Sequence, residues 1–252
     1  MAEPAAPAAG AGVGDGAASA ARGAELAARW DALARRVAEA AEAAGRSAAD
    51  LTVIAVTKTW PYSDIVCLRD IGVRDIGENR AQELAAKLQQ AAIDTTHRAP
   101  ELRWHFIGQL QRNKAGLIAR TCTALHTVDR VELIAPLARA AEAADRRLDV
   151  FLQLSLDGDP KRGGATEAEL ATLADQVEAT DSLRLRGLMA VPPLGEAPRP
   201  AFARLRAVSE GLRRTHPAAS ALSAGMSGDL EEAVMEGATH LRVGTGLMGS
   251  RA

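Results

Sequence analysis

Apolar residues along this chain fall into short runs that alternate with longer periodic stretches. The short runs are apolar almost throughout, which is typical of parallel strands buried on both faces. They predict eight strands: Leu51–Thr57, Val73–Ile76, Trp104–Gly108, Ala124–Val128, Leu148–Ser155, Leu185–Met189, Ala221–Ala224 and His240–Gly244.

The segments between these runs place apolar residues three and four positions apart, which predicts helices. Seven such helices are expected within the alternating region: Tyr62–Ile71, Asn79–Gln90, Arg112–Ala119, Arg130–Ala144, Glu167–Thr180, Ala201–Thr215 and Gly228–Gly237. One further amphipathic helix is expected over Ala24–Ala44. This order predicts a single α/β domain over residues 24–252, a (β/α)₈ TIM barrel with an extra N-terminal helix. A doubly wound open sheet is the alternative, and the absence of a glycine-rich dinucleotide turn after the first strand disfavours it.

The ends and the composition of the chain restrict the class of protein. Residues 1–23 are mostly Ala, Gly and Pro without the basic and strongly apolar parts of a secretory signal, so we expect a disordered tail that packs against nothing. Apolar runs stay well below the ~20 residues that span a bilayer. The formal net charge of −2 argues against a nucleic-acid partner, and two cysteines argue against a disulfide framework. We expect a cytoplasmic monomer without membrane or nucleic-acid partners.

Lysine is rare in this chain, since only Lys58, Lys87, Lys114 and Lys161 occur among 30 basic residues. Lys58 directly follows the first predicted strand, and barrels place their active sites at the carboxyl ends of their strands. We expect an amine there to be partly desolvated, which favours the uncharged form that attacks aldehydes. Position alone leaves both a Schiff-base lysine and a surface lysine open.

Glycines and hydroxyls follow the last two predicted strands, in the segments 223–227 (SAGMS) and 244–246 (GTG). Glycine lets backbone N–H groups approach an anion closely, and barrels commonly bind phosphate at this position. Together with Lys58, these segments predict an aldehyde ligand that bears a phosphate. Arg242 lies within the last strand, where a charged side chain must either point outward or meet a specific partner.

Several longer motifs agree with one known family: AVTKTWP (55–61), IGENRAQE (76–83), WHFIGQLQRNK (104–114), GLMAV (187–191) and the run from Leu222 to Arg251. On these motifs the chain resembles the pyridoxal phosphate homeostasis protein family, which is related to the N-terminal domain of alanine racemase. The resemblance implies a fold type III barrel without the C-terminal β-domain of the racemases.

The resemblance also implies that pyridoxal 5′-phosphate is held as a Schiff base on Lys58. It implies no catalytic residue and no metal. The other cofactor contacts that it implies are Ser223, Met226, Gly244 and Thr245 at the phosphate, Arg242 at the pyridine nitrogen, and Asn79 and His105 at the mouth of the pocket.

The function implied by the resemblance is cofactor homeostasis without turnover, in which the protein stores pyridoxal phosphate and supplies it to apo-enzymes. An amino-acid racemase and an imine-forming aldolase acting on a sugar phosphate are the alternatives. A related racemase takes its second base, a tyrosine, from a second domain, whereas the one tyrosine here, Tyr62, lies close to Lys58 in the sequence. An arginine at the ring nitrogen also disfavours its protonation and weakens the cofactor as an electron sink. We therefore expect a carrier.

Overall fold

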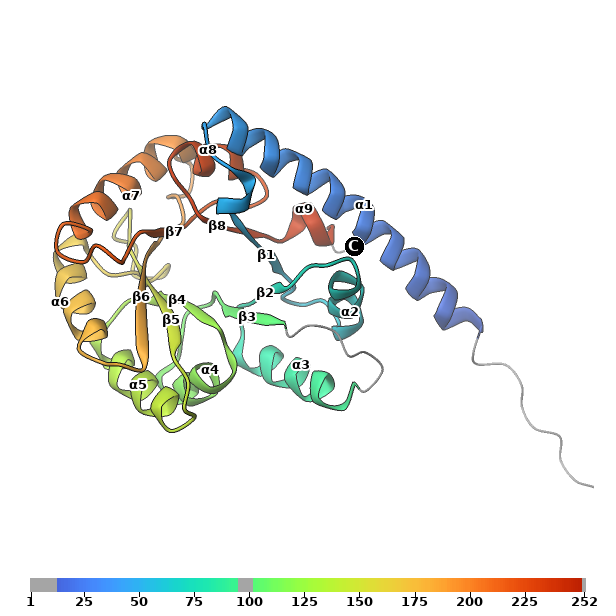
Figure 1. The fold of residues 1–252 in the computed structure, drawn as a ribbon, viewed down its shortest axis with the longest axis horizontal. Coiled ribbons are helices and arrows are strands. Elements are labelled where there is room, and N and C mark those ends of the chain that lie inside the picture. The colour runs from blue at the N-terminus through green and yellow to red at the C-terminus, as the bar shows by residue number, and fades with distance from the viewer. Residues whose placement is uncertain (1–12, 95–101, 251–252) are drawn as a thin grey trace, which may run out of the picture.

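The computed structural model describes residues 13–94 and 102–250. Eight parallel strands close into a barrel in chain order, and helices surround it, which confirms the predicted fold (Figure 1). The strands are β1 (Thr52–Val56), β2 (Asp75–Glu78), β3 (Arg103–Phe106), β4 (Ala124–Val128), β5 (Leu148–Gln153), β6 (Leu183–Met189), β7 (Ala221–Ser223) and β8 (His240–Val243).

The helices alternate with these strands. The α-helices are α1 (Val13–Ala43), α2 (Tyr62–Asp70), α3 (Ala81–Ile93), α4 (Ala115–Thr121), α5 (Ile134–Glu142), α6 (Glu167–Glu178), α7 (Pro198–Leu212), α8 (Leu230–Met235) and α9 (Thr245–Met248). Short 3₁₀ helices are η1 (Ala48–Asp50), η2 (Arg112–Lys114) and η3 (Val131–Leu133). Local signals set several ends: Thr166 precedes α6 and donates its backbone N–H to Glu169 at 2.8 Å, and Gly237 follows α8 with a φ of +92°.

Helix α1 begins at Val13, eleven residues before the predicted start at Ala24, so the tail prediction is wrong for residues 13–23. This segment is rich in alanine, the residue with the highest helix propensity, and α1 packs across α2, α8 and α9 (Figure 1). Arg22 fixes the helix, because its guanidinium donates to Asp64 at 2.8 Å and to the Met248 carbonyl at 3.0 Å. The rest of the predicted tail, residues 1–12, lies outside the described residues.

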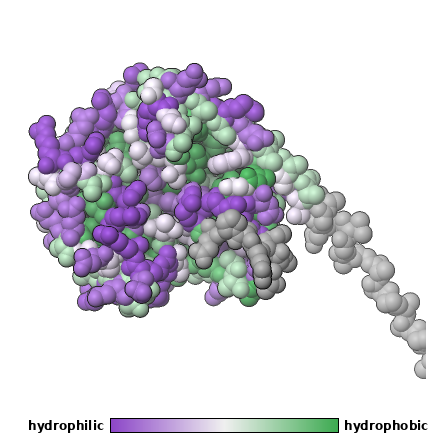
Figure 2. All heavy atoms as spheres, viewed as in Figure 1, coloured by the Kyte–Doolittle hydropathy of each residue, from purple (hydrophilic) through white to green (hydrophobic). Residues whose placement is uncertain are grey.

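The main apolar core lies between the strands and the surrounding helices, where residues such as Ile65, Leu84 and Phe202 are almost fully buried. Outside this core, the molecular face seen in Figure 1 is mainly hydrophilic, with smaller apolar areas (Figure 2). Among the described residues, no helix is both long enough and apolar enough to cross a membrane.

Barrel closure places the strand before Lys58 beside the strand that contains Arg242. Strands β1 and β8 pair in parallel, with Ile54 opposite Arg242 and Ala55 opposite Val243. The carboxyl ends of both strands therefore meet at the same mouth of the barrel, and the side chains that follow them share one site.

Candidate functional site

A cavity of about 450 Å³ opens at the carboxyl ends of the strands. Val56 and Gly108 contribute to its wall, and the hydroxyl of Ser227 lies on one side. Most of the predicted cofactor contacts also line it, namely Lys58, Asn79, Met226, Arg242, Gly244 and Thr245. The structure therefore brings together residues at or just after the ends of β1, β2 and β8 and residues of the loop after β7.

Lys58 lies at the cavity wall, but its side chain is exposed rather than desolvated as expected. The next residue, Thr59, has a φ of +67°, a left-handed conformation that costs energy for a β-branched side chain. The backbone N–H of Thr59 donates to the Glu83 carboxylate at 2.9 Å, which holds this turn. Strained backbone of this kind is concentrated at binding and catalytic sites.

A buried ion pair supports the end of β1 directly below Lys58. Lys87 donates from Nζ to Glu78 at 2.5 Å and to the Thr57 carbonyl at 2.7 Å, and the Thr57 hydroxyl donates to Glu78 at 2.6 Å. Burial raises the pKa of Glu78, although Lys87 and Thr57 oppose that rise. Because Lys87 and the Thr57 hydroxyl both donate to Glu78, and Lys87 also donates to the Thr57 carbonyl, the cluster fixes the backbone from which Lys58 extends.

Arg242 lies at the floor of the cavity and is about 5% exposed. Its guanidinium donates to the Ser223 hydroxyl at 2.6 Å and to the Ala190 carbonyl at 3.1 Å. Burial lowers its pKa to about 10, so the side chain stays protonated at neutral pH. Within the described residues, its hydrogen-bond acceptors are neutral atoms. A buried cation with neutral partners favours a ligand that offers a further acceptor.

The loop between β7 and α8 forms another side of the cavity. Gly225 turns the chain with a φ of +90°, and a Cβ atom there would lie 2.7 Å from Ala233. The loop places Ser227 next to the turn after β8, where the Gly246 N–H donates to Ser227 Oγ at 2.9 Å. A hydroxyl and two glycine-containing segments therefore meet, as the phosphate prediction requires, but the hydroxyl is that of Ser227 rather than Ser223.

Ser223 and His105 do not line the cavity, and here the structure differs from the predicted contacts. Both side chains lie inside the barrel beneath it, 0% and 5% exposed. The Ser223 hydroxyl lies 2.8 Å from His126 Nδ1, and His126 Nε2 lies 3.0 Å from His105 Nδ1. Side-chain direction explains the difference, because these positions on β7, β3 and β4 face the barrel axis. The sequence reasoning missed His126, although a histidine in the apolar strand ALHTV was a usable signal.

The series of hydrogen-bonded side chains that includes Ser223, His126 and His105 continues to the N-terminal mouth of the barrel, opposite the cavity. His105 Nε2 lies 2.9 Å from Asp75, and Arg103 donates to both oxygens of Asp75 at 2.7 and 2.5 Å. Burial opposes ionisation of Asp75, but the bonds from Arg103 and His105 prevail and hold its pKa at about 2. Burial also lowers the pKa of His126 well below its ordinary value, and electrostatic interactions with His105 and Arg242 add to this effect. Asp75 is therefore an anion and His126 a neutral ring.

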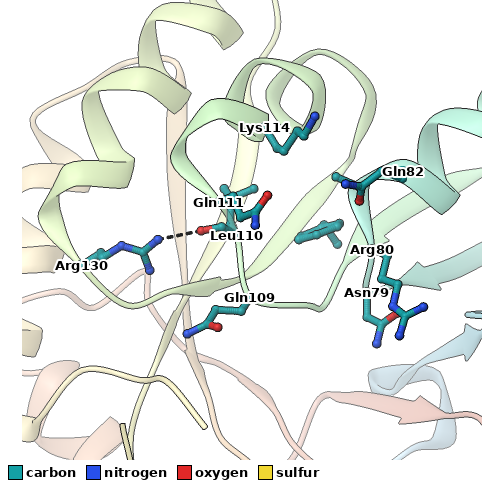
Figure 3. Close-up of a pocket in the computed structure, with 10 residues that line it drawn as sticks. Asn79, Arg80, Gln82, Gln109, Leu110, Gln111, Lys114 and Arg130 are labelled. Carbon is teal, nitrogen blue, oxygen red and sulfur yellow. Dashed lines mark hydrogen bonds between the residues drawn. The ribbon is translucent and has the colours of Figure 1, made fainter. Parts of the chain in front are cut away.

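A second cavity of about 390 Å³ adjoins the first and shares Asn79 with it (Figure 3). Its wall includes Arg80, Lys114 and Arg130, and Arg130 donates to the Leu110 carbonyl at 2.7 Å. The wall of this second cavity therefore carries three cationic side chains.

Comparison with known proteins identifies a family. Residues 29–252 match the model of the alanine racemase N-terminal domain. The chain is similar to the pyridoxal phosphate homeostasis protein of Mycobacterium bovis, with 41% identity over 244 residues that cover 91% of this chain and 94% of that protein. It is similar to the protein of the same name from Escherichia coli, with 39% identity over 220 residues, 86% of this chain and 92% of that protein.

Solved structures agree with the fold. PipY of Synechococcus elongatus, solved with pyridoxal phosphate bound, matches with a TM-score of 0.77 and 33% identity over 89% of this chain and 100% of PipY. Alanine racemase of Corynebacterium glutamicum matches with a TM-score of 0.59 and 18% identity, over 88% of this chain and 61% of the racemase. The second likeness concerns the barrel fold alone.

Proposed function

This chain belongs to the pyridoxal phosphate homeostasis protein family, within the wider family of the alanine racemase N-terminal domain, and from that premise we propose that it binds pyridoxal 5′-phosphate and serves as a carrier of it. The cofactor bound to PipY supports the choice of ligand. The observation that supports it most strongly in this chain is Arg242, a buried cation at the floor of the cavity whose acceptors in the described structure are neutral. Pyridoxal phosphate offers both a ring-nitrogen acceptor and an anionic phosphate.

Each end of the ligand has a matching group in the cavity. Lys58 supplies the amine, which condenses with the aldehyde carbon and releases one water molecule as the imine forms. Ser227 and the turn at Gly244 and Thr245 receive the phosphate, and Arg242 donates to the ring nitrogen. Lys87 is a poor competitor for the aldehyde, because its ammonium is already committed to Glu78 and to a backbone carbonyl.

The lining of the cavity favours a carrier over a racemase. A racemase needs a second positioned base, and general acid–base assistance typically contributes about 10²–10⁴-fold to such rates. Apart from Lys58, the side chains described at this wall include no carboxylate, histidine, cysteine or tyrosine. The hydroxyl of Tyr62 donates to Asp94 at 3.3 Å, so it is engaged elsewhere. We propose that the protein acts as a cytoplasmic monomer and that apo-enzymes receive its cofactor.

A spectrophotometric titration with pyridoxal phosphate tests this proposal. We expect wild-type protein to develop a visible absorption band that saturates, and Lys58→Ala to develop none. Lys161→Ala is the matched control, because Lys161 is an exposed lysine outside the described wall of this cavity. A wild-type protein that gives no band, or a Lys58→Ala variant that keeps the wild-type band, would contradict the proposal.

A further inference from the structure

The interior of the barrel contains a continuous chain of buried polar side chains where TIM barrels usually pack layers of apolar residues. It links five residues from five strands, Asp75, His105, His126, Ser223 and Arg242, through contacts of 2.6–3.0 Å. All five are less than 8% exposed. One end reaches the floor of the cofactor cavity, and the other reaches Arg103, whose side chain is 55% exposed at the N-terminal mouth.

The donors and acceptors in this chain fix one another. Ionised Asp75 only accepts, so His105 Nε2 bears a proton and donates to it. In the arrangement with one proton on each imidazole, His105 Nδ1 then accepts from His126 Nε2, and His126 Nδ1 accepts the proton of the Ser223 hydroxyl. Ser223 Oγ is left to accept from Arg242. Each imidazole nitrogen of the chain thus either donates or accepts, and Asp75 determines the direction of donation.

Reversal of this direction would affect Arg242. In Asp75→Asn, an amide whose N–H₂ faces His105 would donate instead of accepting, so His105 would donate to His126, and His126 Nδ1 would donate to Ser223 Oγ. The Ser223 oxygen has two lone pairs and could accept from both His126 and Arg242, but the hydroxyl proton would lose His126 as its acceptor. A buried hydroxyl without an acceptor is costly, so the Ser223 side chain would reorient toward another acceptor and weaken the hydrogen bond that it accepts from Arg242.

We infer that Asp75, His105 and His126 are positioning residues that hold Arg242 toward the cofactor's ring nitrogen and thereby couple the N-terminal mouth of the barrel to cofactor binding at the opposite mouth. The inference rests on the proposed binding of pyridoxal phosphate. It assigns a role to the buried histidines and to the Asp75–Arg103 pair, none of which lines the cofactor cavity.

Other charged and aromatic groups around the chain leave its direction to Asp75. Phe151 stacks on His126 with ring centroids 4.4 Å apart and offers no acceptor. His240 lies 6.1 Å from His126 between ring centroids, and its Nδ1 is 2.8 Å from the Thr239 hydroxyl. Arg186 and Asp149 act on His240 through charge, and Asp229 acts on Arg242 in the same way. These groups modify the local field without joining the chain.

The experiment compares Asp75→Asn with Asp149→Asn in the full-length protein. Asp149 is a matched control, because it forms an equivalent two-oxygen pair with Arg184 at 2.6 and 2.8 Å near the same mouth, outside the chain. Two quantities are measured with pyridoxal phosphate labelled with ¹⁵N in its ring: the dissociation constant and the ¹⁵N chemical shift of the bound nitrogen. Ser223→Ala, which interrupts the chain next to Arg242, is the second variant in case Asp75→Asn does not fold.

For Asp75→Asn and Ser223→Ala we expect the dissociation constant to rise, on the order of two- to thirtyfold, and the ¹⁵N resonance to move from its wild-type position. Asp149→Asn should leave both quantities at their wild-type values. Wild-type ¹⁵N shifts and affinities in folded Asp75→Asn or in Ser223→Ala would overturn the inference, as would an equal effect of Asp149→Asn. Failure of the wild-type protein to bind pyridoxal phosphate would instead refute the proposed function itself.

Discussion

Replacement of Lys87 by methionine should destabilise the protein strongly, although Lys87 does not line the cofactor cavity. The ammonium group is paired with Glu78, which is fully buried, and it also holds the Thr57 carbonyl. Lys87→Met would leave the Glu78 carboxylate with the Thr57 hydroxyl as its remaining partner in the described structure. Removal of one partner of a buried ion pair typically costs about 3–5 kcal/mol. For a chain of this size the melting temperature should fall on the order of 10 °C.

Urea unfolding, followed by circular dichroism, measures this loss. The double variant Lys87→Met/Glu78→Gln removes the uncompensated charge, so it should recover most of the free energy of unfolding that the single variant loses. Lys161→Met, at an exposed lysine, is the control and should change stability by less than about 0.5 kcal/mol. A loss below about 1 kcal/mol in Lys87→Met, or a double variant as unstable as the single one, would refute the argument that the pair is a buried, mutually dependent unit.

Three further predictions concern pH, the N-terminal helix and the cavity wall. Burial lowers the pKa of His240 to about 4 in the folded protein, below its ordinary 6.5, so its contribution to stability is present above pH 6.5 and is lost as the pH falls toward 4. Urea unfolding across this range should show a smaller decline in His240→Asn, and an unchanged decline would contradict the assignment. Arg22→Ala should lower the free energy of unfolding by about 1–3 kcal/mol, because it leaves the buried carboxylate of Asp64 with fewer donors. A melting temperature equal to that of the wild-type protein would show that the Arg22–Asp64 contact is dispensable. Gly108→Ala should weaken cofactor binding, because its Cβ would lie 1.9 Å from the Asn79 carbonyl oxygen and must displace the backbone there; wild-type affinity in the same titration would argue against a close fit.

The barrel was predictable from sequence because its strands are encoded locally. A parallel strand buried on both faces is a short apolar run, and each of the eight runs overlaps a strand of the barrel, although β2 begins two residues after the start of the predicted run Val73–Ile76. The helix start was less predictable. The alanine- and glycine-rich composition of residues 13–23 is interpreted as disorder from the sequence alone, and the contact of Arg22 with Asp64, 42 residues away in the chain, is not visible in the local sequence.

The candidate site was predictable only in part, for a related reason. Lys58, Gly244 and Thr245 follow strand ends, so their position in the sequence fixes their position at the mouth of the barrel. The directions of the Ser223 and His105 side chains depend on partners from other strands. Spacing along the chain does not reveal those partners.

The position of the imine is the central claim, and reduction followed by peptide mapping tests it most directly. Purified protein loaded with pyridoxal phosphate is treated with borohydride, digested and analysed by mass spectrometry for the pyridoxyl group. The account predicts the group on Lys58, the exposed amine at the cavity wall. A pyridoxyl group found chiefly on Lys87, Lys114 or Lys161 would contradict it.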